Sequence, residues 1–265
     1  MKYKYFFSIA IPFFYRNKYS LQQLKRCVKS IKSQTFTNYE ILISSQNCYE
    51  YLYENSFFKG IKILNGKSAS FIQANLNIAI KNCNGKWIKI IFSDDYFFDK
   101  FSLSKMYNSL VDSRINWACS NSLHFNKRKN QIYKPLISFY NKNILEINTI
   151  GSPSSLVIRN NNPILFDQRT WMRLDVDYYH SLYSNFGKPL YINDVFVVNE
   201  IHDDQFSNLM INKSDQTKNL LKKELDYLCR KHKYKKLNFA YLLIYKIWIK
   251  LQRLILGIIF NKIYK

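Results

Sequence analysis

Residues Asn77–Asp95 read NIAIKNCNGKWIKIIFSDD and give the clearest indication of the fold. This stretch contains the end of an apolar helix, then Gly85 as the expected helix stop, then the continuous apolar run Trp87–Phe92. An apolar run of this length, bounded by a turn signal, is typical of a strand that is buried on both faces. The run ends abruptly in Ser93-Asp94-Asp95, so the sequence predicts two adjacent carboxylates at the carboxyl end of a buried strand.

The pattern on either side of this stretch alternates between strands and helices. Ser20 is the expected N-cap of the first helix, with Gln23 three residues on as in a capping box. The expected elements are, in chain order, strand Phe6–Ile11, a helix from Ser20, strands Tyr39–Ser44 and Ile61–Leu64, helices Ser70–Cys83 and Phe101–Val111, strands Trp117–Phe125 and Ser154–Ile158, and helix Asp175–Ser184. This order predicts an α/β fold with a mostly parallel central sheet, helices on both faces, and ligands at the carboxyl ends of the strands.

Composition and charge narrow the class of protein. The chain has 265 residues, 47% of them hydrophobic and 17% aromatic, which excludes a disordered protein. Five scattered cysteines without a CxxC pair argue against a disulfide framework or a zinc site and fit a reducing cytoplasm. The net charge of +22 suggests nucleic acid or an anionic membrane as a partner. Because no zinc-finger, RNP-like or helix-turn-helix pattern is present, we expect no nucleic-acid partner and keep that function as an alternative only.

The carboxyl-terminal part is the most basic, since the 53 residues from Lys213 carry 14 basic and 3 acidic side chains. No stretch of about 18 uncharged apolar residues predicts a membrane-spanning helix. In Phe239–Lys265, however, Lys246, Lys250 and Arg253 share one helical face. A basic, aromatic amphipathic helix of this kind is typical of peripheral contact with an anionic membrane, and the alternative is packing on its own domain or on another subunit. We therefore expect a helical extension over residues 211–265.

The acidic pair indicates a particular chemistry. Adjacent carboxylates repel each other, so a bound cation offsets the cost of placing them together. Mg²⁺ or Mn²⁺ bound together with a diphosphate is the natural partner, because these ions take one or two carboxylates plus phosphate oxygens. The alternative is that Asp94 or Asp95 only caps the following helix.

Several blocks, in order over about 200 residues, resemble family 2 glycosyltransferases of the GT-A fold. They are SIAIPFFYRN (Ser8–Asn17), SIKSQTFTNYEILIS (Ser30–Ser44) and the stretch Asn77–Asp95. The resemblance implies an inverting enzyme with Mn²⁺ or Mg²⁺ that moves a sugar from a UDP-, GDP- or dTDP-sugar to a glycan or lipid-linked acceptor. It further implies work in bacterial surface polysaccharide synthesis (lipopolysaccharide or capsule), in the cytoplasm on the inner face of the cytoplasmic membrane.

The resemblance also assigns site residues. IGSPSSLVI (Ile150–Ile158) is similar to the segment that lines the acceptor side, and Asp175 in FDQRTWMRLDVDYY (Phe166–Tyr179) matches the general base. Asp177 is the rival base, Asp167 is expected to be structural, and for Asp175 itself a helix cap is the alternative. Asp95 and His202 (in EIHDDQFS, Glu200–Ser207) are the expected metal ligands. The expected nucleotide-sugar-binding residues are Pro12, Phe13, Tyr15, Ser45, Asn77, Ser93 and Asp94.

Four positions depart from the family pattern. Leu76 stands where the family often has an Arg, and Ala79 stands where it has a Gly. Ser45 stands where the family usually has an Asp that reads the base, and Ser93 stands in place of the first Asp of the DxD motif. These departures keep a second hypothesis open, a catalytically silent relative that acts as a membrane-associated scaffold. The expected organisation is a transferase domain over residues 1–210, divided into a nucleotide-sugar-binding half (1–115) and an acceptor half (116–210), followed by the extension 211–265.

Overall fold

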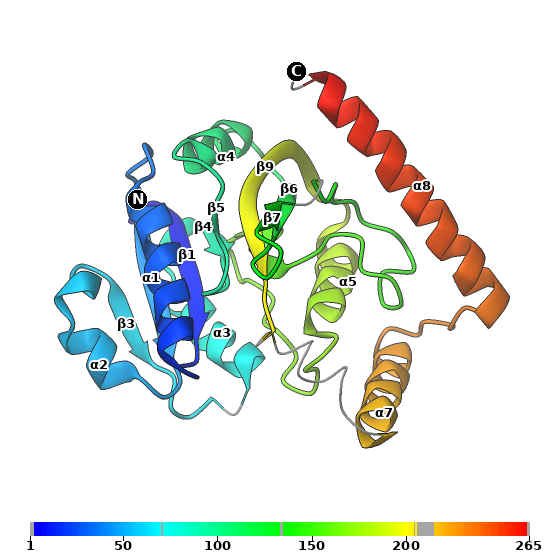
Figure 1. Ribbon diagram of the computed structural model, residues 1–265, viewed down its shortest axis with the longest axis horizontal. Coiled ribbons are helices and arrows are strands. Elements are labelled where there is room, and N and C mark those ends of the chain that lie inside the picture. The colour runs from blue at the N-terminus through cyan, green and yellow to red at the C-terminus, as the bar shows by residue number, and fades with distance from the viewer. Residues whose placement is uncertain (1–2, 70, 133–134, 204, 206–214, 264–265) are drawn as a thin grey trace.

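The computed structural model describes residues 3–69, 71–132, 135–203, 205 and 215–263, and it has one central mixed sheet covered by helices (Figure 1). The strand order is β3-β2-β1-β4-β8-β6-β9-β5, with β7 paired to β6. The strands are β1 (Tyr5–Phe13), β2 (Tyr39–Ser45), β3 (Lys62–Asn65), β4 (Gly85–Ile90), β5 (Tyr96–Phe97), β6 (Trp117–Asn126), β7 (Gln131–Ile132), β8 (Leu156–Arg159) and β9 (Leu190–Ile201). The α/β class is as the sequence predicts.

The first half of the sheet is parallel. β1 lies between β2 and β4 and runs parallel to both, and β3 runs parallel to β2. The carboxyl ends of β1, β2 and β4 therefore meet at one edge of the sheet. This is the edge at which the acidic pair follows β4.

Two local signals act differently from the sequence prediction. The N-cap of α1 (Lys18–Lys32) is Asn17, three residues before the expected Ser20, and Ser20 supplies the second half of the capping box. Gly85 does not end α3 (Ile72–Lys81); it opens β4. A Cβ atom there would lie 2.5 Å from the backbone nitrogen of Ser8 on β1, so only glycine allows the two strands to approach.

The second half of the sheet is mixed. β8 runs antiparallel to both β4 and β6, whereas β9 runs parallel to β6 and antiparallel to β5. The sequence analysis did not recognise β9, although it is 12 residues long. The remaining elements of the globular part are α2 (Tyr49–Glu54), η1 (Ser56–Phe58), α4 (Ser102–Leu110), η2 (Pro153–Ser155) and α5 (Leu174–Phe186).

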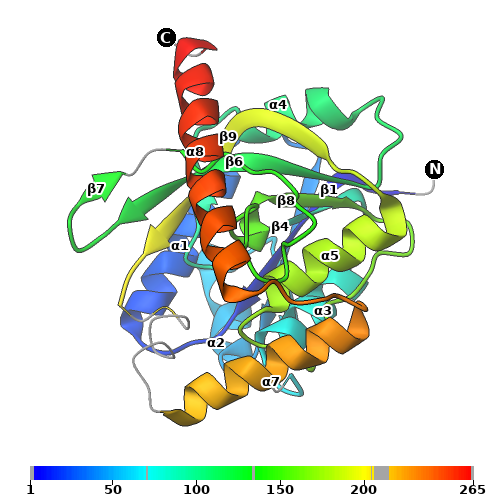
Figure 2. The ribbon, with the colours of Figure 1, turned by 90° about the vertical axis from the view of Figure 1, so that its right-hand side faces the viewer.

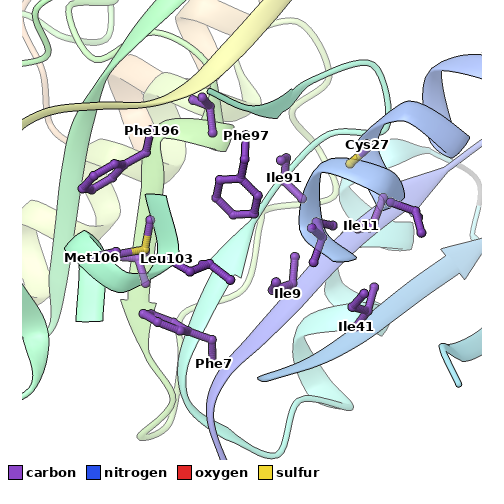
Figure 3. Close-up of a cluster of buried hydrophobic side chains, with 14 of the residues drawn as sticks. Phe7, Ile9, Ile11, Cys27, Ile41, Ile91, Phe97, Leu103, Met106 and Phe196 are labelled. Atoms are coloured by element: carbon purple, nitrogen blue, oxygen red, sulfur yellow. The ribbon is translucent and has the colours of Figure 1, made fainter. Parts of the chain in front are cut away.

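Two apolar cores lie on opposite faces of the sheet. Phe7, Ile9 and Ile11 of β1 point into one of them, where they pack against α1 and α4 (Figure 3). Ala10, between Ile9 and Ile11, faces the other core, which contains residues of α3, α5 and α7. The side-chain alternation of a strand thus directs neighbouring residues of β1 into two separate layers of helices.

The carboxyl-terminal region consists of α7 (Asp215–Lys231) and α8 (Phe239–Ile263). α7 belongs to the globular part, because Leu228 is fully buried in the second core. α8 extends along the side of the molecule, and its final turns project beyond the body (Figures 1 and 2). The domain boundary expected at residues 210 and 211 lies outside the described residues, as do Ser207 of the His202 stretch and the end of the expected helix, Tyr264 and Lys265. Over the described ranges, no helix has the length and apolar content needed to cross a membrane.

Candidate active site

The acidic pair lies between two strand ends. β4 ends at Ile90, Ser93-Asp94-Asp95 follow, and β5 begins at once. β5 pairs with β9 through Tyr96 and Val198, and this pairing brings the end of β9 alongside the carboxylates. Asp95 is 4% exposed, whereas the side chain of Asp94 is 22% exposed. The pair therefore consists of an inner and an outer carboxylate.

Asp95 is held by side chains from two other segments. Its Oδ2 accepts hydrogen bonds from Asn199 Nδ2 at 2.7 Å and from Ser152 Oγ at 3.2 Å. Burial, together with the negative charge of Asp94, raises the pKa of Asp95 to about 7. A nearby cation would stabilise the charged form of this carboxylate.

The outer carboxylate contacts His202, which was expected to be a metal ligand. His202 Nε2 lies 3.2 Å from Asp94 Oδ2, and its ring meets Tyr19 edge to face. The structure thus places His202 against Asp94, the chain neighbour of Asp95. Within the part of the chain that is described, no three His, Cys, Asp or Glu side chains are grouped as a ready-made metal site.

A buried glutamate that the sequence analysis missed stabilises this region. Glu200 at the end of β9 is fully buried and accepts hydrogen bonds from Tyr19, from Gln23 Nε2 at 2.9 Å and from Arg26. Burial alone would raise the pKa of Glu200, but these donors outweigh it and the pKa lies below its usual range. Arg26 also donates to the backbone oxygen of Asp94 at 2.6 Å. The network joins α1, β9 and the acidic pair, and it could be found only once β9 was recognised.

The expected base, Asp175, lies in the first turn of α5 and is half-buried. Its Oδ2 accepts a hydrogen bond from Asn148 Nδ2 at 2.5 Å, and its Oδ1 accepts one from the backbone of Val176 at 2.8 Å. Burial raises the pKa of Asp175 to about 6, against the effect of these donors. A carboxylate with a raised pKa can take a proton from a hydroxyl group near neutral pH.

The rival base, Asp177, has a different environment. It is 2% exposed, and its oxygens bind Lys231 Nζ at 2.7 and 2.8 Å and His232 Nε2 at 2.6 Å. Asp167 lies beside the same lysine, 3.0 Å from its Nζ, and accepts hydrogen bonds from Arg169 and Tyr227. Both carboxylates therefore attach the end of α7 to the transferase body.

One loop, residues 148–155, joins the inner carboxylate to the expected base. Asn148 binds Asp175, and four residues later Ser152 binds Asp95. Gly151 turns the loop between them with φ of +98°, a conformation that favours glycine. Its backbone oxygen accepts hydrogen bonds from Asn148 Nδ2 at 2.9 Å and from Tyr179 OH at 2.8 Å.

A buried lysine holds the other end of this loop. Lys89 of β4 is fully buried, and its Nζ donates to the backbone oxygen of Ser154 and to that of Leu156 at 3.3 Å. Burial lowers the pKa of Lys89 to about 7, although the nearby Asp95 opposes this shift. Ser154 Oγ in turn accepts a hydrogen bond from the backbone of Phe92, at 2.9 Å. These hydrogen bonds fix the loop to β4 and to the residues just before the acidic pair.

The residues expected to bind the nucleotide sugar fall into two groups. Pro12, Phe13, Ser45 and Asn77 are buried. Phe13 packs in the first core, and Ser45 Oγ accepts a hydrogen bond from the backbone of Cys48. Asn77 exchanges two 2.8 Å hydrogen bonds with the backbone of Phe166. In this arrangement the side chains of Phe13, Ser45 and Asn77 support the site from within.

The second group is accessible. Tyr15 is half-buried, and its backbone is joined to the loop after β2 by two 2.8 Å hydrogen bonds with Asn47. Ser93 and Asp94 are also partly exposed. A ligand at the carboxyl edge of the parallel strands could therefore reach Tyr15, Ser93 and Asp94.

Comparison with known proteins now identifies the family. The model of glycosyl transferase family 2 matches residues 8–177, which is more than half of the chain. The chain belongs to this family. It is a glycosyltransferase, and the family supports a nucleotide sugar as the donor. A comparison with curated protein sequences gave no match.

Solved structures confirm the GT-A fold. The chain is similar to S. aureus TarS 1-349 in complex with UDP, with a TM-score of 0.57 and 15% identity over 84% of this chain and 72% of that one. It is also similar to the mannosyltransferase PcManGT from Pyrobaculum calidifontis in complex with GDP-Man and Mn²⁺, with a TM-score of 0.57 and 13% identity over 98% of this chain and 87% of that one. At these identities the likeness concerns the fold alone.

Proposed function

We propose that this glycosyltransferase is an inverting, divalent-metal-dependent enzyme in which Asp175 is the general base. The observation that carries the proposal is the loop 148–155, through which Asn148 fixes Asp175 and Ser152 fixes Asp95. The two carboxylates have different surroundings but are held by the same loop. This arrangement suits a reaction in which one carboxylate binds a cation and the other accepts a proton. Asp95 serves the diphosphate, and Asp175 serves the acceptor.

Asp94, Asp95 and His202 would hold the metal. Their chemistry fits Mn²⁺ or Mg²⁺, which take one or two carboxylates and complete their coordination with phosphate oxygens. Such an ion supplies positive charge that stabilises the departing nucleotide diphosphate. Asn199 and Ser152 orient Asp95, and Arg26 fixes the backbone of Asp94. The proposed donor is a UDP-, GDP- or dTDP-sugar; the solved relatives have UDP, UDP-GlcNAc or GDP-Man bound.

Asp175 would receive the proton of the acceptor hydroxyl while that oxygen attacks the anomeric carbon. The bond from the anomeric carbon to the diphosphate breaks as the new glycosidic bond forms, and a single displacement of this kind inverts the anomeric configuration. Asn148 and the first turn of α5 keep the carboxylate in place. The ion pairs of Asp177 with Lys231 and His232 support the choice of Asp175 over Asp177 for this task.

The proposed acceptor is a glycan or lipid-linked glycan of bacterial surface polysaccharide, reached at the inner face of the cytoplasmic membrane. The support is α8, of which Ile244, Ile247 and Trp248 are exposed apolar residues and Lys246 and Lys250 are exposed cations. A helix of this composition binds an anionic lipid surface.

The test is a thermal-shift panel of UDP, GDP, dTDP, ADP and CMP, each with and without Mn²⁺. A ligand that binds only the folded state at 100 times its Kd adds about 2.7 kcal/mol of stability. We expect a shift that requires both one nucleoside diphosphate and the metal, and that is lost in Asp95→Asn. Asp112→Asn, an exposed carboxylate elsewhere, is the matched control. A well-folded protein that shifts with no nucleotide, or equally without metal, would contradict the proposal.

A further inference from the structure

A concave site is lined by residues other than those of the acidic pair. It is a cleft of about 610 Å³ formed by the segment before β8, the last turns of α5 and the start of β9. Its volume is in the range of small-molecule binding sites. Tyr140, Tyr183 and Tyr191 line it together with Lys142, Lys188 and His180.

The cleft is built on the elements that carry the proposed base. Tyr183 is eight residues beyond Asp175 on α5, which is about 12 Å along the helix axis. Lys142 precedes Asn148, the partner of Asp175, by six residues of the same segment. A chain molecule whose end reaches Asp175 could therefore extend along α5 to the cleft.

The aromatic side chains form a rigid wall. The rings of Tyr140 and Tyr183 stack with their centroids 3.9 Å apart and their planes within 3° of parallel. Tyr191 OH accepts a hydrogen bond from the backbone of Tyr140 at 3.2 Å, and Tyr191 is 45% exposed. Sugar rings have apolar C–H faces and polar edges, and they suit aromatic rings that also carry a hydroxyl group.

The charge of the cleft is positive. Lys142 and Lys188 are exposed, and no carboxylate is among the lining residues. Burial is the main cause that lowers the pKa of His180 to about 4, and the neighbouring His232 lowers it further. His180 is therefore a neutral hydrogen-bonding group at physiological pH, and the two lysines supply the positive charge.

We propose that this cleft binds a negatively charged sugar unit of the acceptor, one that carries a carboxylate or a phosphate, at a distance from the transfer site. This inference rests on the proposed function, because it assigns the cleft to the acceptor of the same reaction. Stacked tyrosines recognise the ring, and Lys142 and Lys188 recognise the anion.

The test measures binding of oligosaccharides matched in length, built of uronic acids, of phosphorylated hexoses or of neutral hexoses, by titration calorimetry at about 0.15 M salt, where long-range charge effects are screened. We expect one of the two acidic types to bind and the neutral type to bind at least tenfold more weakly. The variant Lys142→Ala/Lys188→Ala is expected to lose at least tenfold in affinity, and Tyr183→Ala a similar factor. The matched control Lys29→Ala/Lys59→Ala removes two exposed lysines on the opposite side of the sheet.

Several outcomes would overturn the inference. They are equal binding of the neutral and acidic types, equal loss in the control variant, tighter binding of single-stranded DNA to the same lysines, and absence of binding by any oligosaccharide. Nucleotide and Mn²⁺ binding is measured on the same samples. If it persists while the cleft variants show no effect, the inference fails and the proposed function stands; if it is absent, the proposed function fails. With an identified acceptor, the lysine variant should raise the KM for acceptor and leave kcat unchanged.

Discussion

Two aspartates on one helix turn, Asp175 and Asp177, have different environments, and under the proposed function the first serves catalysis and the second stability. Asp175→Asn removes the group that accepts the proton and keeps the shape of the side chain. We expect kcat to fall by about 10²- to 10⁴-fold, the usual contribution of a general base. Affinity for nucleotide and metal should be unchanged in the same variant.

Asp177→Asn is the matched control. Its loss leaves His232 without its carboxylate partner and Lys231 with Asp167 alone, so we expect the free energy of unfolding to fall by about 3 kcal/mol. The remaining folded protein should keep most of its turnover. The opposite result would contradict this assignment. If Asp177→Asn folded normally but had no activity, and Asp175→Asn stayed active, Asp177 would be the base and Asp175 the structural residue.

The pH dependence follows from the same carboxyl group. Because burial raises the pKa of Asp175 to about 6, kcat should rise with pH through pH 6 and level off above pH 7. The sign follows from the role, since only the deprotonated form accepts a proton. Asn148 donates to the charged form, so Asn148→Ala should raise the pKa of Asp175 and move the profile to higher pH. Recovery of rate at pH 8 would distinguish this effect from a damaged fold.

Lys89 is expected to act through the loop it holds. Lys89→Met removes the donor to the backbone oxygens of Ser154 and Leu156 while it keeps much of the volume. Loss of a buried hydrogen-bond donor costs about 1–3 kcal/mol, so we expect the Kd for nucleotide with Mn²⁺ to rise about tenfold. Lys86→Met is the control, because Lys86 lies on the same strand and binds Val111 instead. Equal effects of the two substitutions would argue against a role for the loop.

At the scale of elements, the sequence predicts the parallel half of the sheet well and the second half less well. β1, β2 and β4 are apolar runs bounded by turns, and the acidic pair after β4 is visible without a structure. β9 escapes because Tyr191, Asn193 and Asp194 interrupt its first half, where it lies at the surface and contains a bulge against β6. Because β9 is missed, the roles of Asn199 and Glu200 are missed as well. These residues reach the acidic pair and α1 only through the pairing of β9 with distant strands.

α7 shows a second limit of the sequence pattern. Its basic composition predicts an appendage, yet Glu224 accepts hydrogen bonds from the backbone of Trp171 and Arg173 just before α5, and Leu228 fills the second core. No local pattern announces these contacts, because their partners lie about 50 residues away. Asp177 likewise has the sequence context of a base and the surroundings of a structural ion pair.

Burial of α7 can be tested with two leucines of that helix. Leu228→Ala should lower the free energy of unfolding by about 2–5 kcal/mol, the cost of a cavity at a fully buried leucine. Leu220→Ala should change it by less than about 0.5 kcal/mol, because Leu220 is 48% exposed. Chemical denaturation of both variants measures the difference. Equal and small effects would show that α7 is a separate appendage.

At the scale of the whole molecule, α8 is attached by one face and open on the other. Ile249 is 3% exposed, and Tyr245 OH donates to Asn141 Oδ1 at 3.0 Å, so the face with these two residues contacts the body. At 100° per residue, Ile244, Ile247 and Leu251 lie on the opposite face, and all three are more than half exposed. Lys246 and Lys250 lie between the two faces. This arrangement of apolar and basic faces is expected of a helix that lies in an anionic lipid surface while the rest of the protein stays outside the lipid.

Vesicle binding tests this arrangement in the intact protein. Each lysine near an anionic surface contributes about 1 kcal/mol, so Lys246→Ala/Lys250→Ala should weaken binding to phosphatidylglycerol-containing vesicles by about 30-fold. Ile244→Glu/Ile247→Glu should abolish binding, since it places charge on the face that enters the lipid. The control Lys29→Ala/Lys59→Ala removes the same charge from the other side of the molecule and should have little effect, which separates a defined face from the general attraction of a +22 protein. If the apolar face instead joined two copies of the chain, the glutamate variant would convert a dimer to a monomer in light scattering and leave vesicle binding unchanged.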